Sequence, residues 1–577
     1  MNSNNHLIKT ALMALAIAFI GMACQTDLKE SDKSANMELP KRPNILWLVT
    51  EDMGAYIPSF GDSTIATPNL SRLANEGVIF PNLYSTSGVC APSRAAIATG
   101  MYPSGIGANH MRTTSYTEVT GLPSYGAVPP PDVHMVSELL RKNGYYCTNN
   151  YKEDYQFEAP KTSWDESSEY AHWRNRADDQ PFFSIVNFTE THESGLFEPY
   201  GHRNIETRHY QLGDRDYSWG KGRMTEEQTP VHLSKDTKFT IPPYLQNTDV
   251  VKRDMWKLYN NIAEMDSQVG AVLKQLEDDG LLENTIIFFY GDHGGPLPRE
   301  KRLIYDSGLN TPMIVRFPNK MRAGTKDNRL TSFVDFAPTL LSLTGTKSPD
   351  YMQGQAFLGE YSAKKERKYI HAAADRFDGF TDVIRAVRDS RYKYIRNYRP
   401  DQGYYLPIVY REKIPSMQEL LKLQQDGKLD SLQLQWFRES KPEEELYDCL
   451  VDPNELNNIA SNVDYKSKVD ELSTEMDRWL KSINDKPSLP EKDLIDRLWK
   501  GAKTQPVTEN PTIDMSDKIT ISCKTEGSSI GYKVISSDGN IPSTWFVYKE
   551  PFEIPEGASI QSQAYRIGFK PSDVISK

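Results

Sequence analysis

Uninterrupted apolar runs alternate with amphipathic stretches along the first part of the chain. Residues 44–50, 181–188 and 285–290 are mostly apolar, which is the pattern of strands buried on both faces of a parallel sheet. Between the last two, apolar residues recur at helical spacing from Val251 to Leu282, and Gly280 marks the stop of one long amphipathic helix. Strand and helix in alternation predict a doubly wound α/β domain.

Beyond this domain the hydrophobic pattern changes twice. Residues 383–395 predict a hairpin and residues 463–484 a helix, so we expect a second, smaller unit over 346–485. Residues 486–512 are rich in Pro, Lys and Glu and predict a linker. From 513 to 577, short alternating strands separated by Gly, Ser and Asp turns predict a small all-β sandwich.

The N-terminus has the pattern of an export signal. Within residues 1–23, Lys9 precedes an apolar run over 11–20 that is too short to span a bilayer. Small residues before Cys24 resemble a lipoprotein signal, in which Cys24 is lipidated, and the polar residues 24–42 predict a tether. We therefore expect an exported periplasmic or cell-surface lipoprotein that meets the membrane only through its lipid.

The composition is that of an ordinary globular protein, and the net charge argues against nucleic acid as a partner. Charged residues are 25% and hydrophobic residues 38% of 577, which is ordinary globular composition. The net charge of −11 gives no support for nucleic-acid binding, and an anionic substrate would need local positive charge at its site. The five cysteines show neither a disulfide framework nor a zinc spacing.

Acidic residues follow two of the predicted strands directly. Glu51 and Asp52 end the first strand, and Asp292 and His293 follow the strand at 285–290. The carboxyl ends of parallel strands lie at one edge of a sheet, where α/β folds bind ligands. The carboxylates are hard oxygen donors suited to Ca²⁺, whereas His293 is not a typical calcium ligand. A capping turn is the alternative interpretation of the acidic pair.

Cys90 lies where an extended run, residues 78–84, gives way to an Ala-rich helix. At a helix N-terminus, unpaired N–H groups and the positive end of the dipole suit a nucleophile or an anion. Arg94, one helical turn further on, could hold the side chain or its charge in place. A lone Cys is more commonly a small buried hydrophobic residue.

The sequence C-A-P-S-R over 90–94, with Thr99-Gly100 behind it, resembles the type I sulfatases. The strand-end segments P-N-I-L-x-L-x-x-E-D-x-G and T-x-I-x-x-x-x-D-H-G resemble the metal segments of the same family. The resemblance implies an alkaline-phosphatase-like fold over 43–345, with a mixed, largely parallel sheet and a smaller antiparallel C-terminal subdomain. A maturase would oxidise the Cys to formylglycine, whose aldehyde hydrate is the nucleophile. One Ca²⁺ would be bound by Glu51, Asp52, modified Cys90, Asp292 and His293.

Two lysines match the sulfate-binding residues of this family. Residues 301–308, K-R-L-I-Y-D-S-G, resemble K-x-x-x-Y-E-G-G, so the resemblance assigns Lys301 to the sulfate and the leaving oxygen. Residues 144–152 align with the stretch that ends in the second sulfate-binding lysine, which is Lys152 here. In both roles the lysine would neutralise developing negative charge, and Arg94 would support the nucleophile.

One histidine matches and two positions depart from the family pattern. His192 matches the last residue of F-H-x-x-H and would protonate the departing alcohol, whereas Thr189 replaces the first histidine. Asp154 stands where the family has a histidine, which leaves open the group that assists sulfate release.

Residues 57–112 and 291–298 look most like the heparan N-sulfatase branch, whose bacterial members act on sulfated polysaccharides, including algal ulvan. The C-terminal β-sandwich resembles modules of chitobiase-type glycoside hydrolases. We therefore expect a polysaccharide sulfatase, with an algal substrate favoured and a glycosaminoglycan possible. Sugar contacts are assigned to His110, Arg112, His371 and Arg376, the last two with interdomain packing as an equal alternative.

Two other functions stay open at this point. A phosphate or phosphonate monoester hydrolase could share the fold and even the formylglycine. A non-catalytic glycan-binding lipoprotein is the second alternative, because Asp154, Thr189 and His293 all depart from the family pattern.

Overall fold

The computed structural model describes residues 39–203, 205–212 and 215–577. The expected signal sequence, the lipidation site at Cys24 and the tether as far as residue 38 lie outside these residues. Within the described ranges, none of the helices combines the length and the apolar character needed to cross a bilayer.

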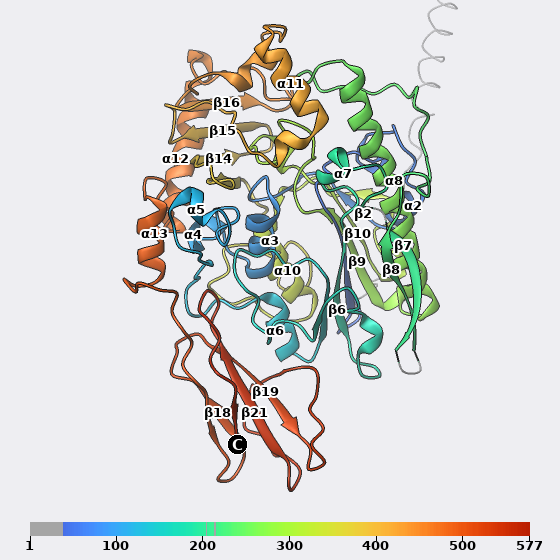
Figure 1. Cartoon of the computed structure of the whole chain (residues 1–577), viewed down its shortest axis with the longest axis vertical. Helices are drawn as coiled ribbons and strands as arrows, with labels where there is room; N and C mark the ends of the chain where they lie inside the picture. Colours follow the sequence, from blue (N-terminus) through green and yellow to red (C-terminus); the bar gives the residue numbers. More distant parts are fainter. Residues whose placement is uncertain (1–38, 204, 213–214) are drawn as a thin grey trace, which may run out of the picture. The chain divides into compact units, whose positions relative to one another are not determined.

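An eight-stranded sheet forms the centre of the catalytic domain (Figure 1). Strand β10 runs antiparallel to its neighbours β9 and β2, and each of the other described pairings in this sheet is parallel. This confirms the mixed, largely parallel sheet. In order across the sheet the strands are β11 (Thr325–Lys326), β2 (Val78–Phe80), β10 (Met313–Arg316), β9 (Thr285–Gly291), β1 (Asn44–Thr50), β6 (Phe182–Phe188), β4 (Tyr146–Asn150) and β5 (Glu166–Ser167).

The register of the central strands brings three chain segments to one edge. Every residue of β1 is buried, as its apolar run predicted. Thr50 at its end pairs with Gly291 of β9 on one side and with Phe188 of β6 on the other. The residues that follow these three strands therefore leave the sheet together.

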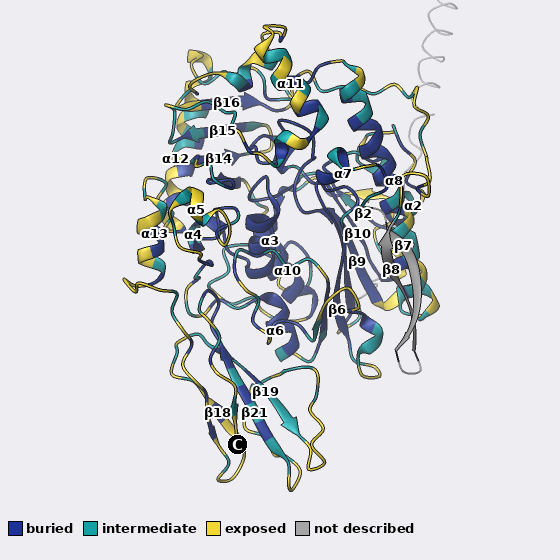
Figure 2. Cartoon of the chain, in the orientation of Figure 1, coloured by how far each residue is buried: buried dark blue, intermediate teal, exposed yellow. Residues whose placement is uncertain are grey.

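Helices cover both faces of the sheet. Figure 1 shows α3 (Cys90–Thr99), α6 (Val136–Lys142) and α10 (Phe336–Leu343) on one face, and α2 (Pro68–Asn75) and α8 (Asp249–Asp278) on the other. Every residue of α3 and α10 is buried (Figure 2). The long helix α8 starts at the cap Thr248, whose hydroxyl accepts from the Val251 N–H, and Gly280 follows it with φ +68°.

The smaller unit is an antiparallel four-stranded sheet with a helix against it. Strands β13 (Ile370–Ala374), β14 (Ile384–Arg388), β15 (Tyr392–Asn397) and β16 (Glu444–Asp448) pair in this order, and α12 (Lys466–Ser482) packs on β14 and β15. Its apolar residues Ile370 and Ile395 belong to the same core cluster as Leu46 and Ile287 of the large sheet. The two sheets are thus joined by one continuous core.

The segment expected as a linker, 486–512, carries a helix instead of extended chain throughout. Helix α13 (Glu491–Leu498) buries Leu494 and Ile495, and Ile495 packs with Tyr125 of the catalytic domain. The composition of residues 486–512 did not indicate this helix, because its apolar residues are few, although they lie on one face.

The C-terminal unit is the expected small β structure. Strands β17 (Thr512–Asp514) and β18 (Thr520–Ser522) form one sheet, and β20 (Phe546–Val547), β19 (Ser529–Ile535), β21 (Ser559–Tyr565) and β22 (Ile575–Ser576) form the other. Its own core is built from four isoleucines, Ile513, Ile519, Ile521 and Ile560. The Ser529 hydroxyl donates to Glu138 of α6 at 2.7 Å, which ties the unit to the catalytic domain.

Short elements complete the chain. The helices are α4 (Pro103–Ile106), α5 (Thr117–Thr120), α7 (Ser194–Phe197), α9 (Asp306–Leu309) and α11 (Pro415–Gln425). The strand pairs are β3 (Leu83–Tyr84) with β12 (Thr331–Ser332), and β7 (Ile205–Leu212) with β8 (Arg215–Arg223).

Candidate active site

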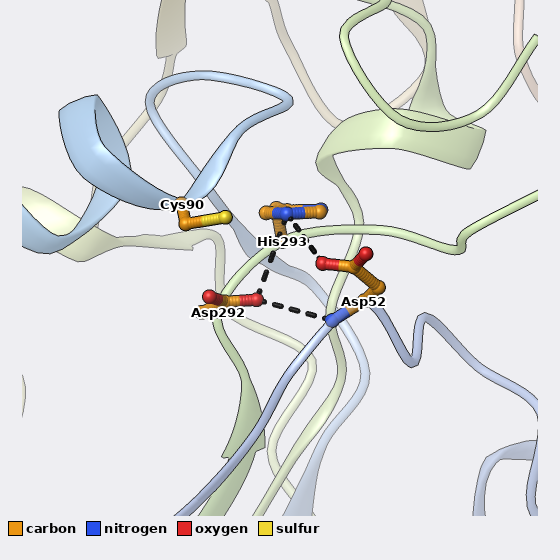
Figure 3. Close-up of side chains that lie close together, drawn as sticks. All are labelled: Asp52, Cys90, Asp292 and His293. Carbon is orange, nitrogen blue, oxygen red and sulfur yellow. Dashed lines mark hydrogen bonds and ion pairs between the residues drawn. The ribbon is translucent and has the colours of Figure 1, made fainter. Parts of the chain in front are cut away.

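Two strand ends and one helix start meet in a buried cluster (Figure 3). The Asp52 N–H donates to Asp292 Oδ1 at 3.2 Å, and the Asp292 N–H donates to Thr50 O at 2.9 Å. His293 Nε2 lies 2.9 Å from Asp52 Oδ1 and 3.6 Å from Asp292 Oδ1. Asp52 takes a left-handed backbone conformation, φ +49°, which Asp tolerates better than most residues and which turns its carboxylate into the cluster.

Cys90 completes this cluster from helix α3. Val89 before it is extended, and Cys90 is the first helical residue, so its thiol lies at the N-terminus of the helix. One ligand atom from each of Asp52, Cys90, Asp292 and His293 lies within 4.8 Å of the others, and all four residues are buried. The carboxylate oxygens are hard donors, so the residues present fit a divalent cation.

A close backbone contact holds the Cys90 segment against the segment that carries Lys301. The Arg302 N–H donates to Gly88 O at 2.7 Å. A Cβ at position 88 would lie 2.5 Å from the Leu303 carbonyl oxygen, so this approach needs a glycine.

Three cations surround the cluster. Lys301 Nζ lies 2.6 Å from Asp52 Oδ2, and Arg94 Nη2 lies 3.1 Å from Asp292 Oδ2. Lys152 Nζ forms an ion pair with Glu51 Oε1, and Arg94 Nη2 lies 3.7 Å from the same oxygen. Glu51 therefore faces Lys152 and Arg94 and lies outside the four-residue cluster, beside it.

The charges stabilise one another despite burial. Burial alone would raise the pKa of Glu51, but Lys152 and other cations outweigh it and hold the pKa at about 2. Burial is likewise outweighed at Asp52, where Lys301 holds the pKa well below its usual range. For Lys301, the loss of solvent is outweighed by Asp52, which raises the pKa of the ammonium group. All three groups are therefore ionised at neutral pH.

His192 lies beside this network. Its ring is largely buried, and burial together with Lys301 lowers its pKa to about 4. The Ser194 N–H donates to Nδ1 at 3.3 Å, so Nδ1 is an acceptor and the proton of the neutral ring is on Nε2. One ligand atom of His192 also lies within 4.8 Å of carboxylate oxygens of Asp52 and Glu193.

Glu193 is a site residue that sequence reasoning missed. Its carboxylate accepts two hydrogen bonds from Arg302, at 2.7 and 2.8 Å, and lies 3.2 Å from Lys301 Nζ. Its backbone N–H donates to Asp52 Oδ2 at 2.8 Å. The signal that could have found Glu193 and Arg302 is their position, since each directly follows a predicted site residue in the chain.

Asp154 and Thr189, two of the three residues that depart from the family pattern, have distinct environments. Asp154 lies 3.8 Å from Lys152 Nζ and accepts from Arg112 Nη1 at 3.1 Å, so an acidic group occupies this flank of the site. Thr189 precedes a stretch in which the Thr191 hydroxyl bonds to the Thr50 hydroxyl at 2.7 Å, which fixes the turn that carries His192.

Of the four expected sugar contacts, His110 and Arg376 contact each other, and each of the four is held by other residues of the chain. Arg112 faces Asp154 at the site, with its side chain 42% exposed. His110 is buried and its Nδ1 accepts from the Arg376 N–H at 3.3 Å. His371 stacks on Trp479 and pairs with Glu475 at 2.9 Å. Arg376 donates twice to Glu491. For His371 and Arg376 these contacts favour the packing alternative.

Known proteins are similar to this chain over most of its length. A sequence model of the family described as Sulfatase matches residues 43–159 and 146–346, and the model described as N-sulphoglucosamine sulphohydrolase, C-terminal, matches 291–426. The chain is 66% identical over 584 residues, which cover 99% of it and 97% of the relative, to an "Ulvan-active sulfatase" of Formosa agariphila.

More distantly related proteins also match this chain. The identity to the human N-sulphoglucosamine sulphohydrolase is 24% over 479 residues, which cover 76% of this chain and 89% of that protein. A solved structure of a protein in complex with its substrate D-glucosamine-2-N,6-O-disulfate matches with a TM-score of 0.53 at 20% identity, over 78% of this chain and 99% of that one. At that identity the match shows a shared fold. The chain therefore belongs to the formylglycine-dependent (type I) sulfatases, enzymes with an alkaline-phosphatase-like fold that hydrolyse sulfate esters.

Proposed function

We propose that this sulfatase removes sulfate esters from the algal polysaccharide ulvan, with formylglycine formed from Cys90. The observation that carries the proposal is the buried cluster of Asp52, Cys90, Asp292 and His293 with Lys152 and Lys301 beside it. The substrate is supported by the 66% identity to an ulvan-active sulfatase over nearly the whole chain.

A metal and a modified residue are implied by the family. We propose Ca²⁺ as the metal, bound by Asp52, Asp292, His293 and the modified residue 90, with Glu51 beside them. Bound there, it would polarise the sulfate. Formylglycine would form when a maturase oxidises the Cys90 thiol to an aldehyde, with the maturase supplying the oxidant. Its hydrate would supply the hydroxyl oxygen that replaces the alcohol on sulfur.

The lysines of this chain would bind and neutralise the sulfate group. Lys301 is held by Asp52 and Glu193, and Lys152 by Glu51 and Asp154, so both ammonium groups are fixed before substrate binds. Preorganised charges stabilise a developing anion without reorganisation at the moment of reaction. Fixed cations at this position therefore favour in-line displacement at sulfur.

The departing alcohol would take its proton from His192. Nε2 carries the ring proton, because Nδ1 accepts from the Ser194 backbone. In the neutral ring this Nε2–H would donate a hydrogen bond to the alcohol oxygen as its bond to sulfur breaks, and to transfer the proton His192 would first take up a second proton and act as the imidazolium ion. The C–O bond of the sulfated hydrate then breaks, which releases sulfate and leaves the aldehyde, and addition of water restores the hydrate.

Export and lipidation also belong to this proposal. They rest on residues 1–24, whose apolar run and Cys24 have the pattern of a lipoprotein signal. A lipid at Cys24 would place the enzyme in the periplasm or at the cell surface, where polymer fragments are accessible.

The proposal is tested in protein expressed together with a maturase. We expect mass spectrometry of the peptide around Cys90 to show an aldehyde in place of the thiol, and ion chromatography to show sulfate released from ulvan. Cys90→Ala should release none. Unmodified Cys90 in a host that matures a control sulfatase would contradict the mechanism. Faster turnover of an aryl phosphate than of an aryl sulfate would favour the phosphate monoester hydrolase, and release from heparan sulfate alone a glycosaminoglycan substrate.

A further inference from the structure

A cavity of about 730 Å³ lies between α4 and the segment that follows it, the smaller sheet with its loops, and residues 485–497. We call it the α13 cavity. Helix α13 lies beyond the residues that the family models match, which end at 426. In Figure 1, α13 lies beside α4 and α5, and a Cβ at Gly107 would lie 2.8 Å from the Leu498 side chain, which confirms the contact.

Two residues of the cavity lining each carry a buried polar atom without a partner. Ser104 and Asn109 both line the α13 cavity, and each residue is nine-tenths or more buried. Within the described residues neither Ser104 Oγ nor Asn109 Oδ1 has a hydrogen-bond partner. Buried polar atoms are normally paired, and a hydroxyl or amide group of a ligand would supply the missing partner.

The charges in the lining favour an anion. Its acidic residues are already paired, because Arg385 contacts Asp375 and Asp485, and Arg376 contacts Glu491. The lining also contains Lys486, Lys492 and Arg497, all exposed, which form no ion pair in the described part of the chain. The cavity therefore offers unpaired cations in a protein whose net charge is −11.

One short stretch of chain connects the α13 cavity with the catalytic site. Asn109 lines the cavity, and Arg112, three residues on, donates to Asp154 beside Lys152. Between them the Met111 N–H donates to Arg376 O at 2.8 Å, which fixes this stretch against the smaller sheet. A polymer with its sulfate at the catalytic cluster could thus extend along this stretch.

We propose that the α13 cavity binds an anionic sugar unit of the polysaccharide, separate from the unit whose sulfate is removed. The inference rests on the proposed function and names a subsite for it. Lys486, Lys492 and Arg497 would bind the anion, a uronate carboxylate or a second sulfate. Ser104 and Asn109 would bind sugar hydroxyl groups.

Kinetics test the inference with Lys492→Ala/Arg497→Ala. The matched control is Lys481→Ala/Lys503→Ala, two exposed lysines outside the lining. Loss of charge-assisted hydrogen bonds should raise KM for ulvan oligosaccharides roughly tenfold. The kcat for these oligosaccharides and the hydrolysis of an aryl sulfate, which is too small to reach the cavity, should not change. Unchanged KM in the test variant, or an equal rise in the control, would overturn the inference.

Binding measurements test this inference independently of the proposed function. In the full-length Cys90→Ala protein, calorimetry would use desulfated ulvan oligosaccharides, which keep their uronates, and a sulfated galactan oligosaccharide without uronates. Weaker binding of the first probe in Lys492→Ala/Arg497→Ala identifies a carboxylate ligand, and weaker binding of the second probe identifies a sulfate. Weaker binding of either probe in Asn109→Ala supports the hydroxyl contact. Unchanged binding of both overturns the subsite. Either result stands even if the active enzyme releases no sulfate.

Discussion

Lys301 Nζ lies 2.6 Å from Asp52 Oδ2, although the two residues are 249 positions apart in the chain. Both are buried, and each stabilises the charged form of the other. The ammonium group is thereby held at the edge of the cluster that contains Cys90. This pair couples the strand end that would bind the metal to the cation that would contact sulfate.

We expect Lys301→Ala to lower kcat/KM for aryl sulfate and for ulvan by a factor of about 10²–10³, the usual effect of removing one preorganised group that stabilises transition-state charge. Steady-state kinetics measure the loss, and circular dichroism checks that the variant folds. Lys252→Ala, at an exposed position on α8, is the control. A loss of less than tenfold would contradict the assigned role.

Glu193→Gln should lower activity roughly 10–100-fold, the usual range for residues that orient catalytic groups. Glu193 contacts Lys301 and accepts two hydrogen bonds from the Arg302 guanidinium, so the neutral amide, with one acceptor oxygen, would hold both cations less firmly. The loss of activity should appear in kcat. Glu193→Asp, which keeps the charge, should recover part of it, and equal losses in the two variants would indicate a merely structural effect.

Chelation should destabilise the protein. Asp52 and Asp292 bring carboxylates together in a buried cluster, and a bound cation would add stability of about 2.7 kcal/mol at a hundred times its Kd. We expect EGTA to lower the Tm and Ca²⁺ to restore it more effectively than Mg²⁺. Asp292→Asn should respond less to both treatments. A Tm that EGTA leaves unchanged in wild-type protein would argue against a resident metal.

His172 should make stability depend on pH. Burial holds its pKa at about 4, and its Nδ1 accepts from the Arg174 N–H at 3.1 Å, which protonation would prevent. Because this folded-state pKa lies below the unfolded value of about 6.5, the stability is fully present above pH 6.5, falls progressively between pH 6.5 and pH 4, and is lost once pH has passed through about 4.

The comparison is with His172→Asn, whose side-chain oxygen can still accept from Arg174 but does not titrate. Between pH 7 and pH 5 the wild type should lose about 2 kcal/mol relative to the variant. Urea unfolding at the two pH values measures this difference. Parallel losses in both proteins would show that His172 does not titrate as described.

The sequence alone determined the elements and the edge at which the site lies. The apolar runs that became β1, β6 and β9 are long enough to identify buried strands. The spacing between Val251 and Leu282 predicted helix α8, which ends earlier, at Asp278. Because parallel strands end at one edge, the positions of Asp52 and Asp292 after two such strands suffice to bring them together. The start of α3 at Cys90 also agreed with its local pattern.

Only the tertiary structure decided which side chains pair. Arg302 and Glu193 are 109 residues apart and meet because the Lys301 segment packs on Gly88. Likewise, His371 stacks on Trp479 and pairs with Glu475. Helix α13 closes a cavity against the catalytic domain. The local pattern of hydrophobic residues shows the period of an element. Ion pairs and cavities depend instead on how close two segments lie that are far apart in the chain, and the packing of the common core sets this distance.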